Sequence, residues 1–366
     1  MEVTLHCYAD ARIQEALAAR SALERTQLVV TAVPSTMRFV YVHGLDRPGI
    51  EQAIPTQPPL HVRAPNILRY GMMEGDAVVE GSNVVYDPQS ATAPAIFQAN
   101  GSVAGRLAVV LNESEGRSMT GLNGAAADEL VEAVRRANCA DVVVLKRGPL
   151  GCLVFDGTVS SHVPALYTQT VWKIGSGDVF SAHFALNWAV HGLGALESAQ
   201  AASRATATYC QTGGVPDEAA VQALDVVPVV PSARYLAGRS PKIYLAAPFF
   251  TLAQLWIVEQ ARSQLRHFGL EVFSPYHDVG VGPADRVVQA DLAGLREADL
   301  VFAIGDGLDA GTLVEIGYAL ARGMPVVIYC ENESQEDLKM VAGSGCIICA
   351  DFVSAIYRTL WAAVSL

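Results

Sequence analysis

The sequence lacks an excess of positive charge and has no long hydrophobic run. Its 366 residues include 25 lysines and arginines against 37 aspartates and glutamates, which gives a formal net charge of −12. Binding to a nucleic acid polymer or to an anionic membrane surface requires clustered lysine and arginine, so we expect neither as a partner. We find no signal-peptide pattern and no apolar run long enough to span a bilayer, and therefore expect no membrane association.

Cysteine is present but is not arranged as a disulfide framework. Seven cysteines, an odd number, are spread through apolar runs, which predicts reduced thiols and a cytoplasmic location. Cys346 and Cys349 have the CxxC spacing, but no second pair and no histidine lies close by. We therefore predict a buried strand at this place and no metal site in the chain.

The length predicts two domains, because 366 residues exceed the usual size of a single core. About half of the residues are apolar, which is enough for two packed cores. Glycines and prolines between residues 212 and 240 indicate a linker. We expect domains at residues 1–214 and 241–366, joined by residues 215–240, both of the α/β class.

The most informative stretch is a strand, an acidic turn and a helix between Asp299 and Gly323. In an open α/β sheet this order places polar groups in the crevice at the strand ends. Asp309 lies in the turn, and we expect Glu315 in the first helical turn, where the helix dipole would keep its carboxylate ionised. An ionised carboxylate can act as a nucleophile. The alternative is structural, because Thr312 and Glu315 also have the spacing of a capping box.

The region from about residue 240 to residue 366 resembles the nucleoside 2-deoxyribosyltransferase family. Several ordered motifs at compatible spacings carry the resemblance, and this favours a catalytic Glu315. The matching motifs are YLAAPFF (Tyr244–Phe250), VFSPYHD (Val272–Asp278), DLAGLREAD (Asp291–Asp299) and DAGTLVEIGYALARGMPV (Asp309–Val326).

The resemblance implies a flavodoxin-like, Rossmann-type parallel sheet in which Glu315 attacks the anomeric carbon of a nucleoside or nucleotide. Asp291 and Asp309 match the carboxylates that hold and protonate the base, and Tyr244 matches a tyrosine near the nucleophile. Without the family, Asp291 would be read as an exposed helix residue and Tyr244 as a core aromatic. The resemblance further implies a homo-oligomer, no cofactor for glycosyl transfer, and substrate contacts from Phe249, Gly311, His277 and Asp278.

The end of the chain departs from this family. Family members often complete the sugar pocket with polar residues near the C-terminus of a neighbouring subunit, and residues 343–366 contain no asparagine for this purpose. The sequence therefore leaves transfer and hydrolysis open, and also the sugar and its phosphorylation state.

A second set of motifs lies in the first half of the chain. A glycine-rich turn at residues 175–177 opens a helical pattern from Asp178 to His191, and bare glycine N–H groups at a helix start form an anion site. Asp178 stands where a base would meet a phosphate acceptor. Asn112-x-x-Glu115 follows one strand, and Lys146-Arg-Gly148 ends another.

Residues 80–214 resemble the C-terminal half of the ribokinase-like (PfkB) sugar kinases, which implies an α/β/α domain. Asp178 matches the catalytic aspartate, and the anion hole is matched by Gly175, Ser176 and Gly177. Asn112 and Glu115 match the magnesium and phosphate motif, and Lys146 and Gly148 the nucleotide-side turn, with ATP and Mg²⁺ as the implied cofactors. Trp172 and Lys173 stand where the family has aspartate and threonine, and the chain before Asn112 is too short for a full kinase.

The first 110 residues carry no catalytic constellation that we recognise. The pattern predicts strands at residues 3–8, 28–33, 39–42, 84–88 and 107–111, a helix at residues 9–23, and a loop at residues 48–65.

Three functions follow as hypotheses from the two resemblances. The first is an enzyme that cleaves or transfers at the N-glycosidic bond of a nucleoside or nucleotide. The second is an effector that cleaves NAD or another nucleotide and is gated by the kinase-like domain. The third is a bifunctional salvage enzyme that also phosphorylates a sugar or nucleoside. A binding protein without turnover is the non-enzymatic alternative.

Overall fold

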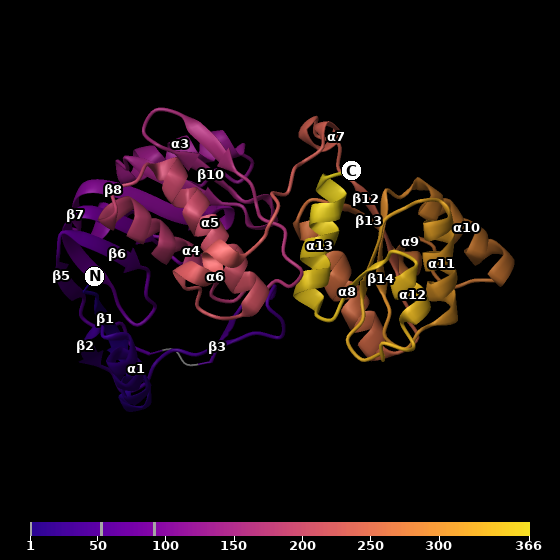
Figure 1. The fold of residues 1–366 in the computed structure, drawn as a ribbon, viewed down its shortest axis with the longest axis horizontal. Helices are drawn as coiled ribbons and strands as arrows, with labels where there is room; N and C mark the ends of the chain where they lie inside the picture. Colours follow the sequence, from indigo (N-terminus) through magenta and orange to yellow (C-terminus); the bar gives the residue numbers. More distant parts are fainter. Residues whose placement is uncertain (1, 52–53, 91–92) are drawn as a thin grey trace.

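The computed structural model describes residues 2–51, 54–90 and 93–366 and shows two α/β lobes joined by helix α13 and by a connecting segment (Figure 1). The N-terminal lobe is built on a seven-stranded sheet, with order β11-β10-β9-β8-β7-β5 and with β6 also paired to β7. Strands β5 to β9 pair in parallel, whereas β9, β10 and β11 pair antiparallel. The strands are β5 Leu60–Arg63, β6 Asn66–Tyr70, β7 Ala77–Asp87, β8 Val103–Asn112, β9 Val142–Lys146, β10 Cys152–Phe155 and β11 Ser160–Val163.

Helices cover both faces of this sheet and form the expected α/β/α arrangement. Alternate residues of the central strands point to opposite faces. Val109 and Leu111 pack under the helices of one face, and Ala108 and Val110 under those of the other. One face carries α2 Glu113–Thr120 and α3 Ala127–Asn138, and the other carries α4 Ser176–Ala185, the π-helix η3 Leu186–Val190 and α5 Ala195–Thr212. Short 3₁₀ turns lie at η1 Phe97–Asn100 and η2 Gly148–Leu150.

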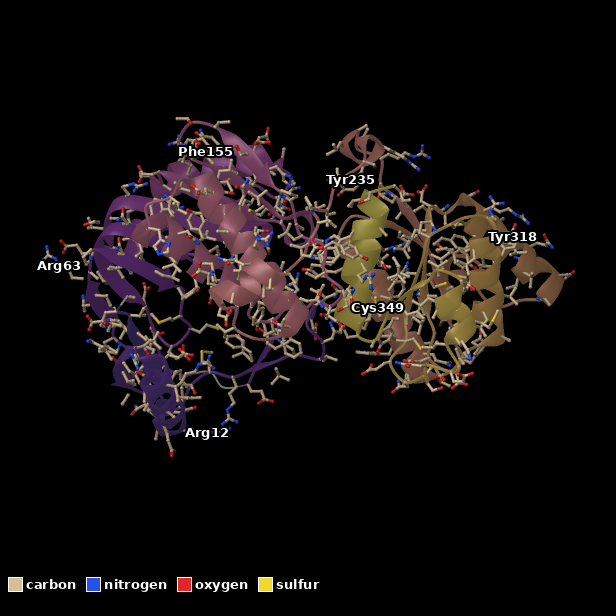
Figure 2. The ribbon with its side chains drawn as sticks, in the orientation of Figure 1. Arg12, Arg63, Phe155, Tyr235, Tyr318 and Cys349 are labelled. Atoms are coloured by element: carbon tan, nitrogen blue, oxygen red, sulfur yellow. The ribbon has the colours of Figure 1, made fainter. Side chains whose placement is uncertain are left out.

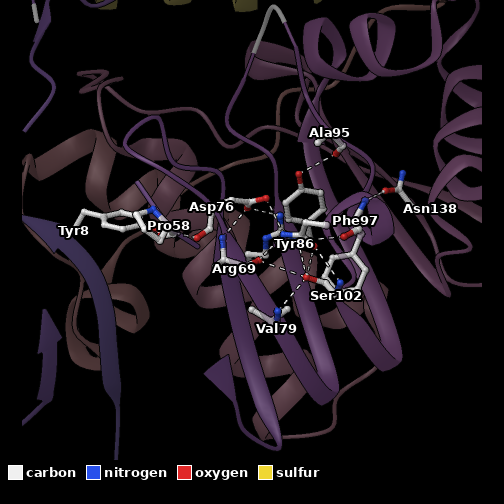
Figure 3. A network of polar contacts seen from close by, with 12 residues as sticks. Tyr8, Pro58, Arg69, Asp76, Val79, Tyr86, Ala95, Phe97, Ser102 and Asn138 are labelled. Carbon is white, nitrogen blue, oxygen red and sulfur yellow. Dashed lines mark hydrogen bonds and ion pairs between the residues drawn. The ribbon is translucent and has the colours of Figure 1, made fainter. Parts of the chain in front are cut away.

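A small unit at the start of the chain attaches to the edge of the sheet. It consists of β1 Thr4–Ala9, α1 Ala11–Glu24 and β2 Gln27–Ala32, followed by the short pair β3 Phe39–Val40 and β4 Gly49–Ile50. The Tyr8 hydroxyl donates to the Pro58 carbonyl at 2.6 Å, and beside it the buried Arg69 binds Asp76 at 2.7 Å (Figure 3). Polar contacts therefore tie this unit to the sheet.

The prediction of a loop at residues 48–65 is wrong in part. Gly49–Ile50 and Leu60–Arg63 are strands, while residues 52–53 lie outside the described part of the chain. The edge strand β5 alternates between half-buried and exposed residues and follows Pro58 and Pro59. A four-residue edge strand needs little apolar sequence, so the flanking prolines concealed it. The strand β3 also ends at Val40, two residues earlier than expected.

The C-terminal lobe is a five-stranded parallel sheet with order β13-β12-β14-β15-β16. Numbered along the lobe this order is 2-1-3-4-5, the flavodoxin-like arrangement. Its strands are β12 Lys242–Ala246, β13 Glu271–Phe273, β14 Leu300–Ile304, β15 Val326–Tyr329 and β16 Ile347–Cys349. Cys349 ends strand β16 and is buried, whereas Cys346 precedes the strand and is half-buried, so the prediction of a buried strand is confirmed in part.

Two pairs of helices sandwich this sheet. Helices α8 and α13 pack on the face formed by Leu245 and Phe302, and α10 and α11 pack on the face formed by Tyr244 and Val301. The helices are α8 Leu252–His267, α9 Pro275–Asp278, α10 Ala284–Glu297, α11 Ala310–Ala321, α12 Lys339–Gly343 and α13 Phe352–Val364. None of the helices in the described ranges is long and apolar enough to cross a membrane.

Helix α13 has two buried faces and lies between the lobes (Figure 1). Ile356 and Leu360 belong to the core of the C-terminal lobe, whereas Tyr357 and Trp361 pack against residues of the N-terminal lobe. Side chains fill the space between α13 and that lobe (Figure 2). The connecting segment contains α6 Glu218–Ala223, which lies against α5 of the N-terminal lobe, and α7 Ala233–Leu236, which lies near the end of α13 (Figure 1).

Gly294 in α10 sets how closely this helix approaches the sheet. A Cβ atom at this position would lie 2.3 Å from the ring of Phe273 in β13. We predict that Gly294→Ala lowers the stability of the C-terminal lobe by about 1–3 kcal/mol, because the ring or the helix must move. Gly317→Ala is the matched control, since nothing lies within 4 Å of its Cβ position in helix α11.

The control should raise stability by up to about 1 kcal/mol, through helix propensity. Thermal unfolding followed by circular dichroism measures both variants. Equal unfolding midpoints for the two would contradict the close packing of α10.

Candidate functional site

The centre of the candidate site is a hydrogen bond between Tyr244 in strand β12 and Glu315 in helix α11. The Tyr244 hydroxyl donates to Glu315 Oε1 at 2.6 Å. Tyr244 is completely buried and its ring stacks on Phe273 with 5.5 Å between centroids. Strand β12 and strand β14, which precedes α11, are the neighbours at which the strand order reverses. This is the position at which open α/β sheets bind ligands.

Helix α11 begins at Ala310, earlier than the sequence suggested. Asp309 is its N-cap, and its Oδ2 accepts from the Thr312 N–H at 2.8 Å and from the Thr312 hydroxyl at 3.1 Å. Glu315 therefore lies in the second turn, so the expectation of a first-turn position is wrong. The alternative interpretation, a Thr312–Glu315 capping box, is not what the structure shows. Aspartate is at least as good an N-cap as threonine, and Leu308, with φ of 44°, turns the chain into it.

The ionisation of Glu315 also differs from expectation. Burial raises its pKa to about 7; the Tyr244 hydrogen bond lowers it, whereas the charges of Asp291 and Asp309 raise it further. Because Glu315 lies beyond the first turn, the helix dipole has little effect on it. The prediction that the helix start keeps this carboxylate ionised is therefore wrong, and the carboxyl group titrates near neutral pH.

Asp291, in helix α10, is the second acid of the site. Burial raises the pKa of its carboxyl group. Its Oδ1 is buried and has no hydrogen-bond partner among the described residues. A buried oxygen without a partner is uncommon in proteins and is often found where a ligand binds. The pKa of Tyr244 is raised by burial and by Glu315 and Asp291, so the phenol keeps its proton and remains a donor.

The remaining predicted substrate residues have other contacts. His277 Nδ1 lies 3.0 Å from Ser274 Oγ and its Nε2 contacts Glu259 of α8, while Asp278 accepts from the Ser274 N–H at 2.8 Å. These contacts hold α9 against the strand end and α8. The Phe249 ring lies 5.4 Å from the ring of Tyr276. At Gly311, a Cβ would lie 3.0 Å from Asp309 Oδ2, so glycine leaves room for that carboxylate.

The kinase-like residues form a second group in the N-terminal lobe. Gly175, with φ of 85°, caps helix α4, and the Ser176 hydroxyl donates to the Lys173 carbonyl at 2.7 Å. The Gln89 side chain donates to Asp178, and burial together with the charge of Asp87 raises the pKa of this aspartate. Gln89 precedes the helix by almost ninety residues, and no local pattern marked it.

Lys146 is paired with an acid that the sequence analysis missed. Its Nζ lies 2.8 Å from Asp87 Oδ2, which also accepts from the Ser181 hydroxyl at 2.6 Å. Asp87 is completely buried at the end of β7. Burial lowers the pKa of Lys146, but Asp87 and Glu115 more than offset this effect and raise it. The sequence signal that could have identified Asp87 is an acidic residue at the end of an apolar strand.

Asn112 and Glu115 satisfy each other in a capping box at the start of α2. The Asn112 side chain accepts from the Glu115 N–H at 2.9 Å, and Glu115 accepts from the Asn112 N–H at 2.8 Å. The described residues contain no group of three histidine, cysteine, aspartate or glutamate side chains that could hold a metal ion.

Some of the kinase-like residues, among them Asn112 and Ser176, line a cavity of about 260 Å³ that has one wall from the other lobe. Lys146, Gly148 and Gly177 line it on the N-terminal side, and Tyr357 and Trp361 of α13 line it on the C-terminal side. The Trp361 indole N–H donates to the Pro149 carbonyl at 3.0 Å. The C-terminal lobe thus supplies a wall of the kinase-like cavity.

Comparisons with known proteins match each lobe separately. Residues 243–347 match the family model described as nucleoside 2-deoxyribosyltransferase, and residues 82–219 match that of the pfkB family carbohydrate kinases. Both resemblances inferred from the motifs are thereby confirmed. A comparison with curated proteins gave no match.

Solved structures are similar to parts of the chain. A 2-deoxyribosyltransferase from the psychrotolerant bacterium Bacillus psychrosaccharolyticus is 32% identical over 33% of this chain and 90% of its own, with a TM-score of 0.27. Ribokinase from Thermotoga maritima is 16% identical over 61% of this chain and 80% of its own, with a TM-score of 0.43. Arabidopsis thaliana ribokinase, complexed with ribose and ATP, is 20% identical over 40% of this chain and 54% of its own, with a TM-score of 0.32.

The raised pKa of Glu315 predicts a pH-dependent stability. Between about pH 4.5 and pH 7 the folded chain holds this proton more tightly than the unfolded chain, so stability falls as the pH rises through this window. The Glu315→Gln side chain does not ionise. Over the same pH range, the free energy of unfolding of this variant should therefore fall less than that of the wild type, by up to about 3 kcal/mol. Thermal unfolding midpoints of both proteins at pH 5 and pH 8 measure the difference.

Glu336→Gln, at an exposed glutamate on the same lobe, is the control and should follow the wild type. Parallel pH profiles for the wild type and Glu315→Gln would show that Glu315 is not desolvated.

Proposed function

We propose, from the match of residues 243–347 to the family model described as nucleoside 2-deoxyribosyltransferase, that this chain cleaves or transfers at the N-glycosidic bond of a nucleoside or nucleotide. The observation that carries the proposal is the 2.6 Å hydrogen bond from Tyr244 to Glu315 Oε1. Because Asp309 caps the helix, the Glu315 carboxyl group is not used by its own backbone.

The first step is displacement of the base. Glu315 Oε2 attacks the anomeric carbon, the bond from this carbon to the base nitrogen breaks, and its electron pair stays with the base. A carboxylic acid gives that nitrogen a proton. The product is a glycosyl ester of Glu315 and a neutral base. Tyr244 binds Oε1 and thereby leaves Oε2 to react.

Asp291 is suited to donate the proton, because its raised pKa keeps its carboxyl group protonated to higher pH than that of an exposed aspartate. Its unpartnered Oδ1 can accept an N–H of the base. Asp309 already accepts two hydrogen bonds from Thr312 and is better suited to hold the base than to exchange its proton.

The second step decides between transferase and hydrolase. The nitrogen of a second base, or water, attacks the anomeric carbon, and the ester bond breaks to regenerate the Glu315 carboxylate. The acceptor loses a proton to the carboxylate that had protonated the first base. An effector that hydrolyses NAD or another nucleotide under control of the kinase-like lobe shares these steps and differs in substrate and in the use of water.

Glu315→Ala tests the nucleophile directly. We expect it to lower base release or base exchange by at least about 1,000-fold, because the covalent route is lost. Tyr244→Phe removes one donor and should lower the rate by about 10- to 100-fold. A panel of nucleosides, nucleotides and NAD, with and without a free acceptor base, followed by chromatography, measures release and exchange.

Glu336→Ala, at an exposed position, is the matched control and should keep full activity. Undiminished turnover in folded Glu315→Ala would refute the nucleophile. Exchange that exceeds hydrolysis identifies a transferase, and the reverse identifies a hydrolase.

Phosphoryl transfer by the N-terminal lobe is a separate question. The geometry that favours it is the buried ion pair of Lys146 and Asp87 beside Ser181, facing the same cavity as Gly177. Tyr357 and Trp361 occupy one wall of that cavity and limit the room for a nucleotide.

If the lobe is a kinase, Asp178→Asn should abolish transfer from labelled ATP to sugars or nucleosides while Glu315-dependent turnover persists. Equal labelling by wild type and variant would exclude Asp178 as the base.

A further inference from the structure

A second, larger cleft lies between the two lobes and belongs to neither family site. It has a volume of about 710 Å³, within the range of small-ligand sites. The N-terminal lobe contributes residues 42–44, 170–174 and 210–213, and the C-terminal lobe contributes parts of α8, β15 and α13. Helices α8 and α13 lie on the face of the C-terminal sheet opposite to α11, so Glu315 is not part of this cleft.

Lys173 lies where this cleft meets the smaller kinase-like cavity, because it lines both. Its ammonium group has no hydrogen bond or ion pair in the described part of the chain, in contrast to Lys146 with Asp87. Burial lowers the pKa of Lys173, and so does the positive charge of Lys146, while the Cys210 side chain offsets this only in part. A cation in this position is unfavourable without an anion. The unpaired Lys173 therefore creates a place for a phosphate group.

Aromatic rings also line the cleft. Trp172 is 57% exposed and Trp256 is 45% exposed, although both line a concave surface. The His43 ring lies 6.5 Å from that of Trp256. Exposed indole rings in a cleft offer flat surfaces on which a nucleobase stacks, whatever its hydrogen-bonding pattern.

Acidic side chains complete the lining and limit the charge of a ligand. Glu331 accepts from the Tyr329 hydroxyl through Oε2, which leaves Oε1 for an N–H or O–H donor. Asp351 caps α13 through its side chain. One unpaired lysine beside two carboxylates favours a single phosphate group over a long polyphosphate chain.

We propose that the interdomain cleft binds a nucleoside monophosphate, with the phosphate on Lys173 and the base against Trp172 and Trp256. The ligand contacts both lobes and is bound only when they are joined. Binding does not require turnover at Glu315, so this site and the proposed function stand or fall separately.

The test uses the full chain carrying Glu315→Ala, which prevents substrate consumption. Titration calorimetry with a panel of nucleoside monophosphates measures binding, with inorganic phosphate and the unphosphorylated nucleosides as separate arms. Tryptophan fluorescence is a second readout, because Trp172 and Trp256 lie in the cleft and Trp361 in the adjoining cavity. We expect a monophosphate to bind more tightly than phosphate or nucleoside alone.

Lys173→Met should weaken monophosphate binding by about 10- to 100-fold, because it removes the charge and keeps the side-chain stem. It should leave the weaker nucleoside binding unchanged. Trp172→Ala should weaken nucleoside and monophosphate binding alike. Lys339→Met, at an exposed lysine, is the control and should bind as the parent.

Lys173→Met removes a poorly solvated charge, so its unfolding midpoint should equal or exceed that of the parent, which excludes misfolding as the cause of weaker binding. The proposal is overturned if no monophosphate binds more tightly than both phosphate and nucleoside, or if Lys173→Met binds it as the parent does.

Discussion

Helix α13 is the element on which the arrangement of the two lobes depends. Ten of its thirteen residues are buried. A helix that is apolar on all sides is stable only inside a core. Because Ile356 and Leu360 pack in one lobe and Tyr357 and Trp361 against the other, separation of the lobes would expose the second pair to water. Burial of one large side chain contributes about 1.5–3 kcal/mol, so two such residues hold the lobes together effectively.

Directional contacts fix the position of α13 more narrowly than apolar packing alone. The Val171 N–H donates to Ser354 Oγ at 2.8 Å, and Arg358 Nε donates to the Tyr167 hydroxyl at 2.8 Å. Both contacts connect α13 to the segment that precedes the glycine turn of the N-terminal lobe. The walls of the kinase-like cavity and of the interdomain cleft are therefore set by the same helix.

More of the fold than of the candidate site could be predicted from the sequence. Apolar strands separated by helical patterns and the motif order were sufficient for two α/β lobes. The motifs also identified Glu315, Tyr244 and Asp291 as candidates, although their roles remain predictions. The ionisation of Glu315 could not be predicted, because it depends on the burial of its side chain and on the charges of Asp291 and Asp309 in the folded chain. The N-cap was misassigned because Asp309 and Thr312 both fit the local pattern.

Contacts between residues distant in the sequence were harder to predict. Asp87 and Lys146, both in the N-terminal lobe, are 59 residues apart, and Trp361 reaches Pro149 of the other lobe across 212 residues. Lys173 was recognised only as a departure from the kinase pattern, since the sequence does not show that it lacks an anionic partner. The contact of Trp361 with Pro149 arises from the packing of α13, which no motif of either family describes.

A contact chain links the interdomain cleft to the loop before α11. Tyr329 lines the cleft and donates to Glu331 Oε2 at 2.6 Å, and the Glu331 N–H donates to Asp306 Oδ1 at 2.8 Å. Asp306 and Gly307 lie in the turn that leads to Asp309, and the Gly307 N–H is held by Glu333 at 2.8 Å. Since Asp309 caps α11 and is one of the acids that raise the pKa of Glu315, hydrogen bonds connect the wall of the cleft to the turn that positions this acid.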